Sequence, residues 1–337
     1  MTERRNPRVG VIADSNLQRL ALSSAVKGHG YELGLNIGPE RLDDSALSGL
    51  DVLLVDMAEE DEAFLDRLLD HTDAPILFGL EQAPAQGTRQ YPRWERRVFV
   101  KLQDTVGEPV LEEHLDVLEA APAPQPAAAL SLPDEVLKHA GGDSLELVCV
   151  IAASLGGPAA VKEFLDSLPK GLPVAFVLAQ HIDARMQETL AHVLVRHNGM
   201  PAKVAVAGDR LRHGEMLILP VANEIDFSAD GSVIVRNLKW DGPYSPSIDQ
   251  TIANVTRRFG ARSGAVIFSG MGGDGSISGP LMQDAGGFIW AQTADSCACS
   301  SQPDSMRATG CVSFNGTPVE LAAHLVEHIR AVITAAA

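Results

Sequence analysis

In the first third of the chain, short apolar runs alternate with segments whose apolar residues recur every three or four positions. The apolar runs are Val9–Ala13, Val52–Val55, Pro75–Phe78 and Val98–Val100. The helical stripes are Leu17, Leu20, Ala21 and Ala25 after the first run, then Phe64, Leu65, Leu68 and Leu69. Repeated strand–helix units of this size predict a parallel, doubly wound α/β sheet.

The second half of the chain repeats this α/β pattern with longer strands. The predicted strands are Leu147–Ala153, Pro173–Ala179, Ala265–Ser269 and Gly287–Ala291. A hairpin-like insert is expected over Lys203–Asn237, with Asp230-Gly231 as its tight turn. The last helix presents Leu321, Leu325, His328 and Ile329. The fold class is therefore α/β in both parts, mostly parallel with antiparallel decoration.

A change in composition separates the two parts. Residues 120–129 are rich in proline and alanine and cannot build a core, so they predict a semi-extended linker. The apolar positions of Leu111–Leu118 predict the last helix of the first domain. We expect a first domain at residues 1–119, a linker at 120–143 and a second domain at 144–337.

Ser154 lies between a buried strand and an amphipathic helix. Pro158, which has no N–H to lose, suits the first turn of that helix. Three roles fit this serine: a nucleophile whose oxyanion is held by the following amides, part of a phosphate cradle, or an ordinary helix N-cap. The strand–turn–helix pattern alone does not choose among them.

A nucleophilic serine needs a base, and the base needs an orienting acid. His181 follows a predicted strand directly, unlike the histidines inside predicted helices. Asp274 lies in a glycine-rich loop after another strand, so both belong to the sheet edge that carries Ser154. The amide of Met271, with that of Leu155 or Gly156, is the expected oxyanion hole.

The same glycine-rich loop permits a dinucleotide-binding interpretation. Gly270–Gly275 matches G-x-G-x-x-G, and Asp295 stands 20 residues beyond it, where an acid that binds ribose is expected. Against this, the Asp274 carboxylate would repel a pyrophosphate. The serine motif also departs from one hydrolase pattern, because Ala152 occupies the first glycine position of G-x-S-x-G.

Charge and composition narrow the function classes. The formal net charge of −17 argues against a nucleic-acid-binding surface. No apolar run approaches the roughly 20 residues of a membrane span, and the N-terminal residues do not resemble a signal peptide. We therefore expect a cytoplasmic protein without membrane insertion. The spacing of the four cysteines does not match a zinc site, which favours reduced structural thiols and no metal in the second domain.

Asp14, Asp56 and Lys101 each follow a predicted strand of the first domain. This arrangement resembles a flavodoxin-like response-regulator receiver domain, in which Asp56 matches the phosphoacceptor, Asp14 one of the acidic pair that holds Mg²⁺, and Lys101 the lysine of the fifth strand. The departures are Ala13 for the other acid, Gly79-Leu80 where a hydroxyl residue is usual, and Leu102 for a proline. A degenerate receiver kept for docking and a phosphorylatable one both remain open.

Five ordered motifs of the second domain carry a closer resemblance. They are Ile151-Ala-Ala-Ser-Leu-Gly-Gly-Pro158, Ala179-Gln-His-Ile182, Tyr244-Ser-Pro-Ser-Ile-Asp249, Ser269-Gly-Met-Gly-Gly-Asp-Gly275 and Ala291-Gln-Thr-Ala-Asp-Ser-Cys297. Over about residues 145–332 the chain is similar to the chemotaxis protein-glutamate methylesterases, and the receiver-like domain and linker complete their layout. The departures are Leu155 for a frequent threonine and Asp183 for a frequent proline.

This resemblance implies a serine hydrolase that removes methyl esters from glutamates of chemoreceptors and often deamidates glutamines. By motif position, Ser154 is the nucleophile, His181 the base and Asp274 the orienting acid, with no cofactor for catalysis. The implied partners are the cytoplasmic helices of methyl-accepting chemoreceptors and a chemotaxis histidine kinase. A non-catalytic chemosensory adaptor and a dinucleotide-dependent oxidoreductase are the alternatives.

Overall fold

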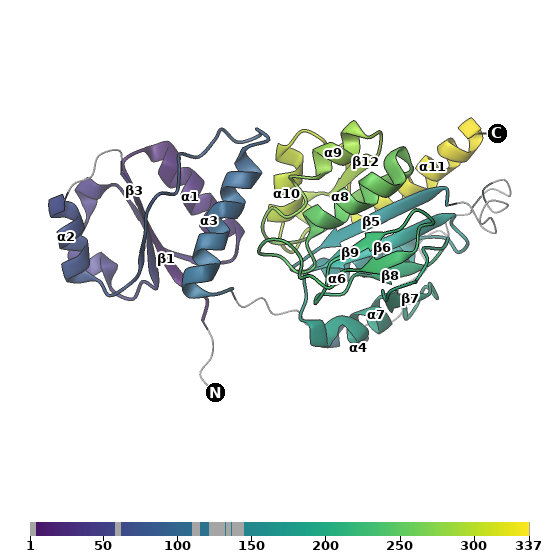
Figure 1. Ribbon diagram of the computed structural model, residues 1–337, viewed down its shortest axis with the longest axis horizontal. Coiled ribbons are helices and arrows are strands. Elements are labelled where there is room, and N and C mark those ends of the chain that lie inside the picture. Colours follow the sequence, from purple (N-terminus) through teal and green to yellow (C-terminus); the bar gives the residue numbers. More distant parts are fainter. Residues whose placement is uncertain are drawn as a thin grey trace. The chain divides into compact units, whose positions relative to one another are not determined.

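A computed structural model describes residues 5–57, 62–109, 115–120, 132, 136 and 145–336 (Figure 1). The chain forms two compact units, Met1–Leu111 and Glu112–Ala337. Each unit has its own sheet, so each is described by itself.

The first unit contains a four-stranded parallel sheet in the order β2-β1-β3-β4. Its strands are β1 (Arg8–Ala13), β2 (Glu32–Ile37), β3 (Val52–Asp56) and β4 (Ile76–Leu77). The doubly wound order agrees with the predicted class. The sequence prediction missed β2, because its side chains are only partly buried and show no apolar run.

Three helices among the described residues accompany this sheet, and the stripe predicted for the first of them is buried only in part. They are α1 (Asn16–Gly28), α2 (Glu62–His71) and α3 (Tyr91–Val106), with 3-10 turns η1 (Pro39–Arg41) and η2 (Asp44–Leu47). Leu17 and Leu20 of α1 are 79% and 62% exposed, whereas Leu22 and Val26 are fully buried. The helix exists where the spacing predicted it, but it is rotated so that two leucines of the predicted stripe face solvent.

The predicted strand Val98–Val100 is wrong, because these residues lie inside α3. Trp94, Val98 and Leu102 recur every four residues and are all buried. This helical period over 16 residues outweighs the three-residue apolar run. Consequently Lys101 is a helical residue and does not end a fifth strand.

The second unit is built on a seven-stranded sheet in the order β13-β12-β11-β5-β6-β8-β7, with every pairing parallel. The strands are β5 (Leu147–Ala153), β6 (Val174–Gln180), β7 (Ala202–Val204), β8 (Met216–Ile218), β11 (Ser263–Ile267), β12 (Phe288–Gln292) and β13 (Phe314–Gly316). All residues of β5, β6, β11 and β12 are buried, as their near-continuous apolar runs predicted.

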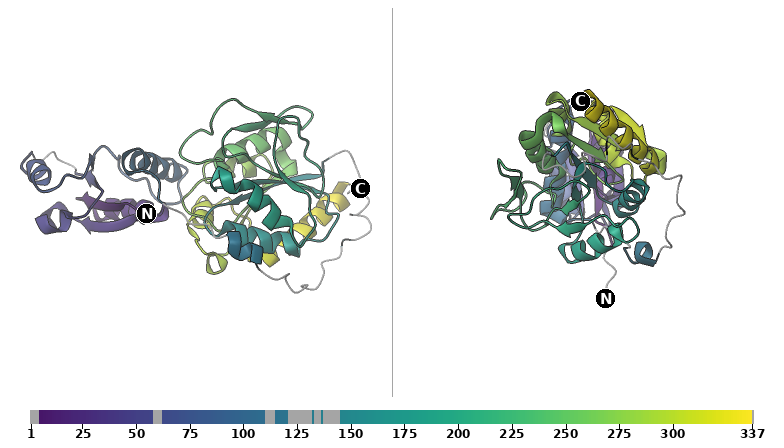
Figure 2. Two further views of the ribbon diagram at one scale, coloured as in Figure 1. Left: turned by 90° about the horizontal axis from the view of Figure 1, so that it is seen from below. Right: turned by 90° about the vertical axis from the view of Figure 1, so that its right-hand side faces the viewer.

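Helices cover both faces of this sheet, as Figures 1 and 2 show. One face packs against α6 (Gly157–Ser167), α7 (Gln187–Val195) and α11 (Pro318–Ala336). The other packs against α8 (Ile248–Phe259), α9 (Gly279–Asp284) and α10 (Ser301–Ala308). Alternate residues of β5 enter the two cores: Cys149 and Ile151 on one side, Val148 and Val150 on the other. Three further 3-10 turns are η3 (Ala184–Met186), η4 (Gly260–Arg262) and η5 (Ala294–Ser296).

The predicted hairpin is correct in its second half only. Strands β9 (Ile225–Phe227) and β10 (Val233–Val235) pair antiparallel around the Asp230-Gly231 turn, with Val233 opposite Phe227. The first half of the insert instead supplies β7 and β8, which extend the main parallel sheet. Three-residue strands are too short to show which sheet they will join.

The helix expected at the end of the first domain belongs to the second unit. This helix, α4 (Leu115–Ala120), contacts α7, and Leu115 is buried in the core of the second unit. Leu132 and Val136, from the predicted linker, contact the same core. The remaining linker positions lie outside the described residues. No helix in the described part of the chain has the length and hydropathy needed to cross a membrane.

Candidate active site

The carboxyl ends of β5, β6 and β11 meet at one edge of the larger sheet. Ala153 of β5 pairs with Gln180 of β6, so the residues that follow them, Ser154 and His181, are neighbours across the two strands. The amide of His181 donates to the carbonyl of Ala153 at 3.1 Å, which continues the strand pairing by one residue. The nucleophile and base predicted from sequence therefore lie side by side.

Hydrogen bonds of its backbone amide and carbonyl hold Ser154 in place, and the residue is almost fully buried. Its amide donates to the carbonyl of Ser269 at 3.1 Å, and its carbonyl accepts from Gly157 N at 2.8 Å and Gln180 Nε2 at 2.9 Å. The N-cap of α6 is Gly156, with φ at +72°, so the hydroxyl of Ser154 is not used as a helix cap. The N-cap interpretation of Ser154 is wrong.

Both the backbone conformation at position 156 and the atoms around it require a glycine there. Its positive φ disfavours side chains, and a Cβ there would lie 2.5 Å from the Cβ of Ala298. The loop after β12 thus packs directly on the turn that presents Ser154.

Asp274 contacts His181 and the first turn of α8 at the same time. Its Oδ2 lies 3.1 Å from His181 Nε2 and accepts from Ile248 N at 2.6 Å, while Oδ1 accepts from Asp249 N at 3.0 Å. Burial raises the pKa of this carboxyl, but the hydrogen bond and charge of His181, with the two amides, outweigh it and leave the pKa below its ordinary value. Asp274 is therefore an ionised, oriented partner for the imidazole.

The contact with Asp274 determines which ring nitrogen can serve Ser154. Because Nε2 of His181 binds the carboxylate, Nδ1 is the nitrogen left for a proton from the serine. The hydroxyl of Ser154 and the ring of His181, both described residues, share no hydrogen bond here. Such contacts are often long in ligand-free sites and shorten when substrate binds.

Tyr244 stacks on the imidazole of His181, with ring centroids 5.0 Å apart and planes within 3°. The two rings come from loops more than 60 positions apart, after β6 and before α8. The stack restricts rotation of the imidazole. Sequence reasoning placed Tyr244 in a motif but gave it no role, since nothing in the local pattern shows which residue covers the histidine.

Two of the three amides proposed for the oxyanion hole are uncommitted. Within the described residues, no acceptor contacts the amide of Leu155 or that of Met271. The amides on either side of Met271 are used, since Gly270 N donates to Cys299 O and Gly272 N to Ser301 Oγ. The Met271 amide is thus available to a ligand.

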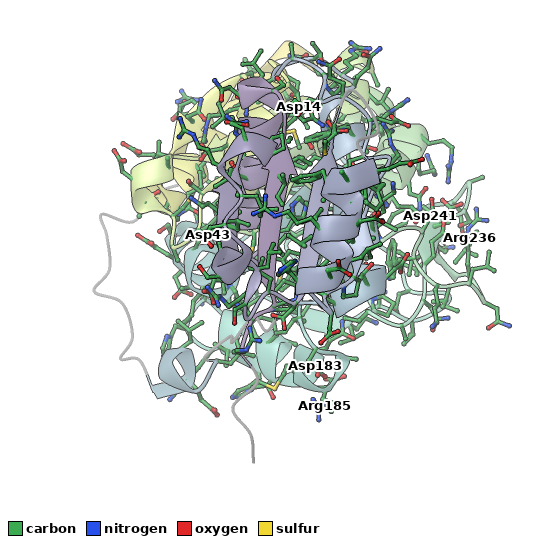
Figure 3. The ribbon with its side chains drawn as sticks, turned by 90° about the vertical axis from the view of Figure 1, so that its left-hand side faces the viewer. Asp14, Asp43, Asp183, Arg185, Arg236 and Asp241 are labelled. Atoms are coloured by element: carbon green, nitrogen blue, oxygen red, sulfur yellow. The ribbon has the colours of Figure 1, made fainter. Side chains whose placement is uncertain are left out.

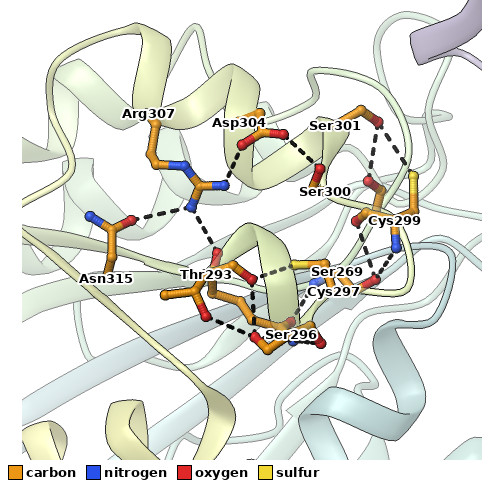
Figure 4. A network of polar contacts seen from close by, with 12 residues as sticks. Ser269, Thr293, Ser296, Cys297, Cys299, Ser300, Ser301, Asp304, Arg307 and Asn315 are labelled. Atoms are coloured by element: carbon orange, nitrogen blue, oxygen red, sulfur yellow. Dashed lines mark hydrogen bonds and ion pairs between the residues drawn. The ribbon is translucent and has the colours of Figure 1, made fainter.

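A network of polar side chains, drawn in Figure 4, ties the loop after β12 to the site. Ser269 Oγ donates to the carbonyl of Leu155 at 2.8 Å and accepts from Cys299 N at 3.0 Å. Arg307 donates to the Gln292 carbonyl at 2.7 Å and to Asn315 at 3.2 Å. The residues between 293 and 307 therefore support the turn after Ser154, which the sequence analysis did not foresee.

The dinucleotide interpretation of Gly270–Gly275 is not supported. Asp274 is buried and fully engaged by His181 and α8, and two glycine amides of the loop are already bonded to protein. Asp295, the proposed ribose ligand, is exposed in the η5 turn. The loop therefore holds the carboxylate of Asp274 where a pyrophosphate would have to bind, and the two negative charges would repel each other.

Asp183, the departure from the usual proline, makes a local surface pair. Its carboxylate accepts from Arg185 N at 2.9 Å and from the guanidinium at 2.7 Å, and Figure 3 shows the two side chains together. These bonds lower the pKa of Asp183 to about 2. The pair starts the η3 turn and does not contact Asp274.

In the first unit, Asp14 and Asp56 are neighbours at the ends of β1 and β3, where the amide of Asp14 donates to the Asp56 carbonyl at 3.3 Å. Burial raises the pKa of the Asp56 carboxyl, a hydrogen bond from Gln18 opposes this, and the charge of Asp14 adds to it. Gln18 also bonds the loop after β4, through Glu81 O at 2.9 Å and Ala83 N at 2.8 Å.

Lys101 reaches the end of β4 from α3. Its ammonium donates to the carbonyls of Phe78 and Gly79 at 3.1 and 2.7 Å. Asp14 and Asp56 could supply two oxygen ligands to Mg²⁺. Within the described residues, no group of three or more His, Cys, Asp or Glu side chains is arranged for a metal ion.

Comparison with known proteins agrees with this geometry. The CheB methylesterase family model matches residues 149–325, which is more than half of the chain. The chain belongs to the CheB methylesterase family. That family match spans Ser154, His181 and Asp274.

Two curated relatives and one solved structure illustrate the similarity. A protein-glutamate methylesterase/protein-glutamine glutaminase of Saccharophagus degradans is 31% identical over 57% of this chain and 52% of its own length. One of Anaeromyxobacter dehalogenans is 35% identical over 54% of each chain. The CheB methylesterase catalytic domain of Thermotoga maritima, 24% identical, covers 54% of this chain and 98% of its own with a TM-score of 0.52, which supports the fold. The chain spans about half the length of the curated relatives it matches.

Proposed function

We propose that this CheB-family chain hydrolyses methyl esters of glutamate side chains on methyl-accepting chemoreceptors, and that it also deamidates glutamines. One observation carries the proposal: His181 binds the buried Asp274 at 3.1 Å directly beside Ser154, at the edge of the sheet where the family model matches. The names of the relatives, which include both methylesterase and glutaminase, support the two substrates.

In the first half of the reaction, the hydroxyl of Ser154 attacks the ester carbonyl while Nδ1 of His181 takes its proton. The carbonyl oxygen gains negative charge, which hydrogen bonds from the uncommitted amides of Leu155 and Met271 stabilise in this mechanism. The C–O bond to the methoxy group then breaks, and methanol leaves with the proton from His181. The product is an acyl-enzyme on Ser154.

In the second half, water attacks the acyl-enzyme and His181 accepts its proton. The bond to Ser154 Oγ breaks, the serine recovers the proton, and a glutamate side chain is released. Asp274 stays ionised throughout, because its lowered pKa disfavours protonation, and it stabilises the imidazolium in both halves. The reaction uses these side chains and water, without a cofactor.

We further propose that the first unit is a receiver-like regulatory domain that interacts with a chemotaxis histidine kinase. The parallel order β2-β1-β3-β4 and the adjacent Asp14 and Asp56 support this assignment. Asp56 is the candidate phosphoacceptor, and Mg²⁺ is its candidate cofactor through Asp14 and Asp56. Gln18 is hydrogen-bonded to Asp56, and the ammonium of Lys101 is bonded to backbone carbonyls. These bonds favour a degenerate receiver site.

The decisive experiment measures methanol release from receptors that carry tritiated methyl esters. We expect release by the wild-type chain and by Ser167→Ala, a control serine at the far end of α6. Ser154→Ala should release none above background. Release by Ser154→Ala would remove the nucleophile assignment, and no release by any protein would overturn the esterase proposal.

A serine-directed fluorophosphonate separates an enzyme from a non-catalytic adaptor. The proposed mechanism predicts covalent labelling of the wild-type chain and loss of labelling in Ser154→Ala. A wild-type chain that stays unlabelled would favour the adaptor.

A further inference from the structure

Gln302 is a buried carboxamide whose polar atoms lack partners in the protein. Its side chain is 1% exposed, and neither Oε1 nor Nε2 has a hydrogen-bond partner among the described residues. A buried polar group left unpaired costs about 1–3 kcal/mol, and native structures contain few of them. A bound ligand that supplied the missing partners would account for such a group.

The carboxamide of Gln302 lies against Gly270, next to the catalytic serine. The amide of Gln302 donates to the carbonyl of Gly270 at 3.0 Å, which joins the start of α10 to the loop that carries Asp274. A methyl group on Gly270 would overlap Gln302 Oε1 and would lie 3.0 Å from Ser154 Cβ. The carboxamide of Gln302 and the side chain of Ser154 therefore both lie beside the Cα of Gly270. A side chain at position 270 would clash with Gln302, so this position requires glycine.

The surroundings hold this carboxamide in place. Ser301, the preceding residue, accepts a hydrogen bond from Gly272 N at 3.0 Å and donates one to the carbonyl of Gly270 at 3.3 Å. Gly270 N also donates to the Cys299 carbonyl at 2.9 Å. Cys299, Ser301 and Gln302 are thus all bonded to the glycine-rich loop, and a rigid support favours precise binding of a ligand.

The chemistry of a carboxamide identifies what it would bind. Gln302 offers N–H donors at Nε2 and an acceptor at Oε1, so a group that has an acceptor and a donor on one carbon would satisfy both atoms together. A primary carboxamide is such a group. A methyl ester has acceptors alone, and would leave Oε1 of Gln302 unpaired.

We propose that Gln302 is a specificity-determining residue that binds the carboxamide of a substrate glutamine and favours deamidation. This inference rests on the proposed function. Gln302 Nε2 donates to the substrate carbonyl oxygen, and Oε1 accepts from its NH2 group. Ser154 Oγ then forms the acyl bond, the C–N bond breaks, and ammonia leaves with the proton that His181 took from the serine; water hydrolyses the acyl-enzyme to glutamate.

The test compares ammonia and methanol release by one protein from matched substrates. The substrates are a chemoreceptor cytoplasmic fragment that carries, at one position, either glutamine or glutamate γ-methyl ester. The variants are Gln302→Met, which keeps the side-chain length without its hydrogen-bonding groups, and Gln302→Leu. Because the amide substrate loses two hydrogen bonds and the ester loses one, we expect the ratio of ammonia to methanol kcat/KM to fall about tenfold.

Thermal unfolding and fluorophosphonate labelling accompany the kinetics. Replacing an unpaired buried amide by an apolar group should leave the melting temperature equal or higher, and labelling of Ser154 should persist. An unchanged ratio in a variant that melts at or above the wild-type temperature would overturn the role of Gln302, as would a wild-type chain that releases methanol but no ammonia. A wild-type chain that releases neither would overturn the proposed function itself.

Discussion

Asp274 binds the backbone amide of Asp249, and Asp249 in turn binds two backbone amides that follow Asp274. Asp274 Oδ1 accepts from the amide of Asp249 at 3.0 Å, and Asp249 Oδ1 accepts from Ile277 and Ser278 at 3.0 and 2.8 Å. Both carboxylates are buried. This reciprocal pair clamps the glycine-rich loop to the N-terminus of α8, whose unpaired amides favour negative charge. The clamp aims the other oxygen of Asp274 at His181.

Replacing Asp249 tests the clamp. In Asp249→Ala the amides of Ile277 and Ser278 lose their acceptor, and we expect a loss of about 3 kcal/mol in the free energy of unfolding with about a tenfold lower kcat. Asp249→Asn keeps one acceptor oxygen and should lose less of both. Urea unfolding and methanol release measure the two effects. An alanine variant that matches wild type in both would show that the loop is held by other contacts.

Replacing Asp274 tests the orienting acid. In Asp274→Asn the NH2 group of the new side chain would face N–H donors of His181 or α8. The imidazole therefore loses its charged partner, and its tautomer is no longer set. We expect kcat to fall by about 10³–10⁴. Release of methanol under single-turnover conditions measures this. A variant within tenfold of wild type would mean that Asp274 only supports the loop.

The pH dependence of stability offers a second check on Asp274. The folded pKa lies below the unfolded value of 3.8, so the carboxylate contributes stability above that value and loses it as the pH falls through the folded pKa. The wild-type advantage over Asp274→Asn in urea unfolding should be largest near neutral pH and shrink below about pH 4. A constant difference across that range would contradict the lowered pKa.

Replacing Tyr244 tests the support of the imidazole. The ring of Tyr244 lies parallel to that of His181 with centroids 5.0 Å apart, so its removal frees the imidazole to rotate. Tyr244→Ala should lower kcat about tenfold, and Tyr244→Phe, which keeps the ring, should stay close to wild type. Methanol release as a function of substrate concentration separates kcat from KM. Equal losses in the two variants would assign the effect to the hydroxyl.

Replacing Glu95 tests a buried acid in the first unit. Burial raises the pKa of this carboxyl in α3 from 4.5 to about 7. Its folded state therefore binds a proton that the unfolded chain releases, and the associated stability is present below about pH 4.5 and lost as the pH rises through 7.

Glu95→Gln has no charge to bury at any pH. It should match wild type near pH 4 and exceed it by about 3 kcal/mol at pH 8 in the transition of the first unit. Calorimetry at both pH values measures this difference. A variant that is less stable than wild type at pH 8 would show that the carboxylate has a stabilising partner.

In the segment that forms α3, the helical period of the buried residues was a better guide than the short apolar run. Val98–Val100 has the composition of a strand, yet Trp94, Val98 and Leu102 share one buried helical face. Lys101 was predicted to end a strand, yet it lies in α3, and its side chain reaches the carbonyls after β4 from there. A long side chain can arrive at a site from several backbones, so position in the sequence does not identify which.

The apolar runs were enough to predict the elements that carry Ser154, His181 and Asp274, because buried parallel strands are continuous apolar runs and their ends share one edge. How that edge is completed depends on contacts between loops that are distant in the sequence. The clamp of Asp249, the stack of Tyr244 and the unpaired carboxamide of Gln302 join residues from separate loops. Their contacts depend on how the loops pack on one another, and no period in the sequence records that packing.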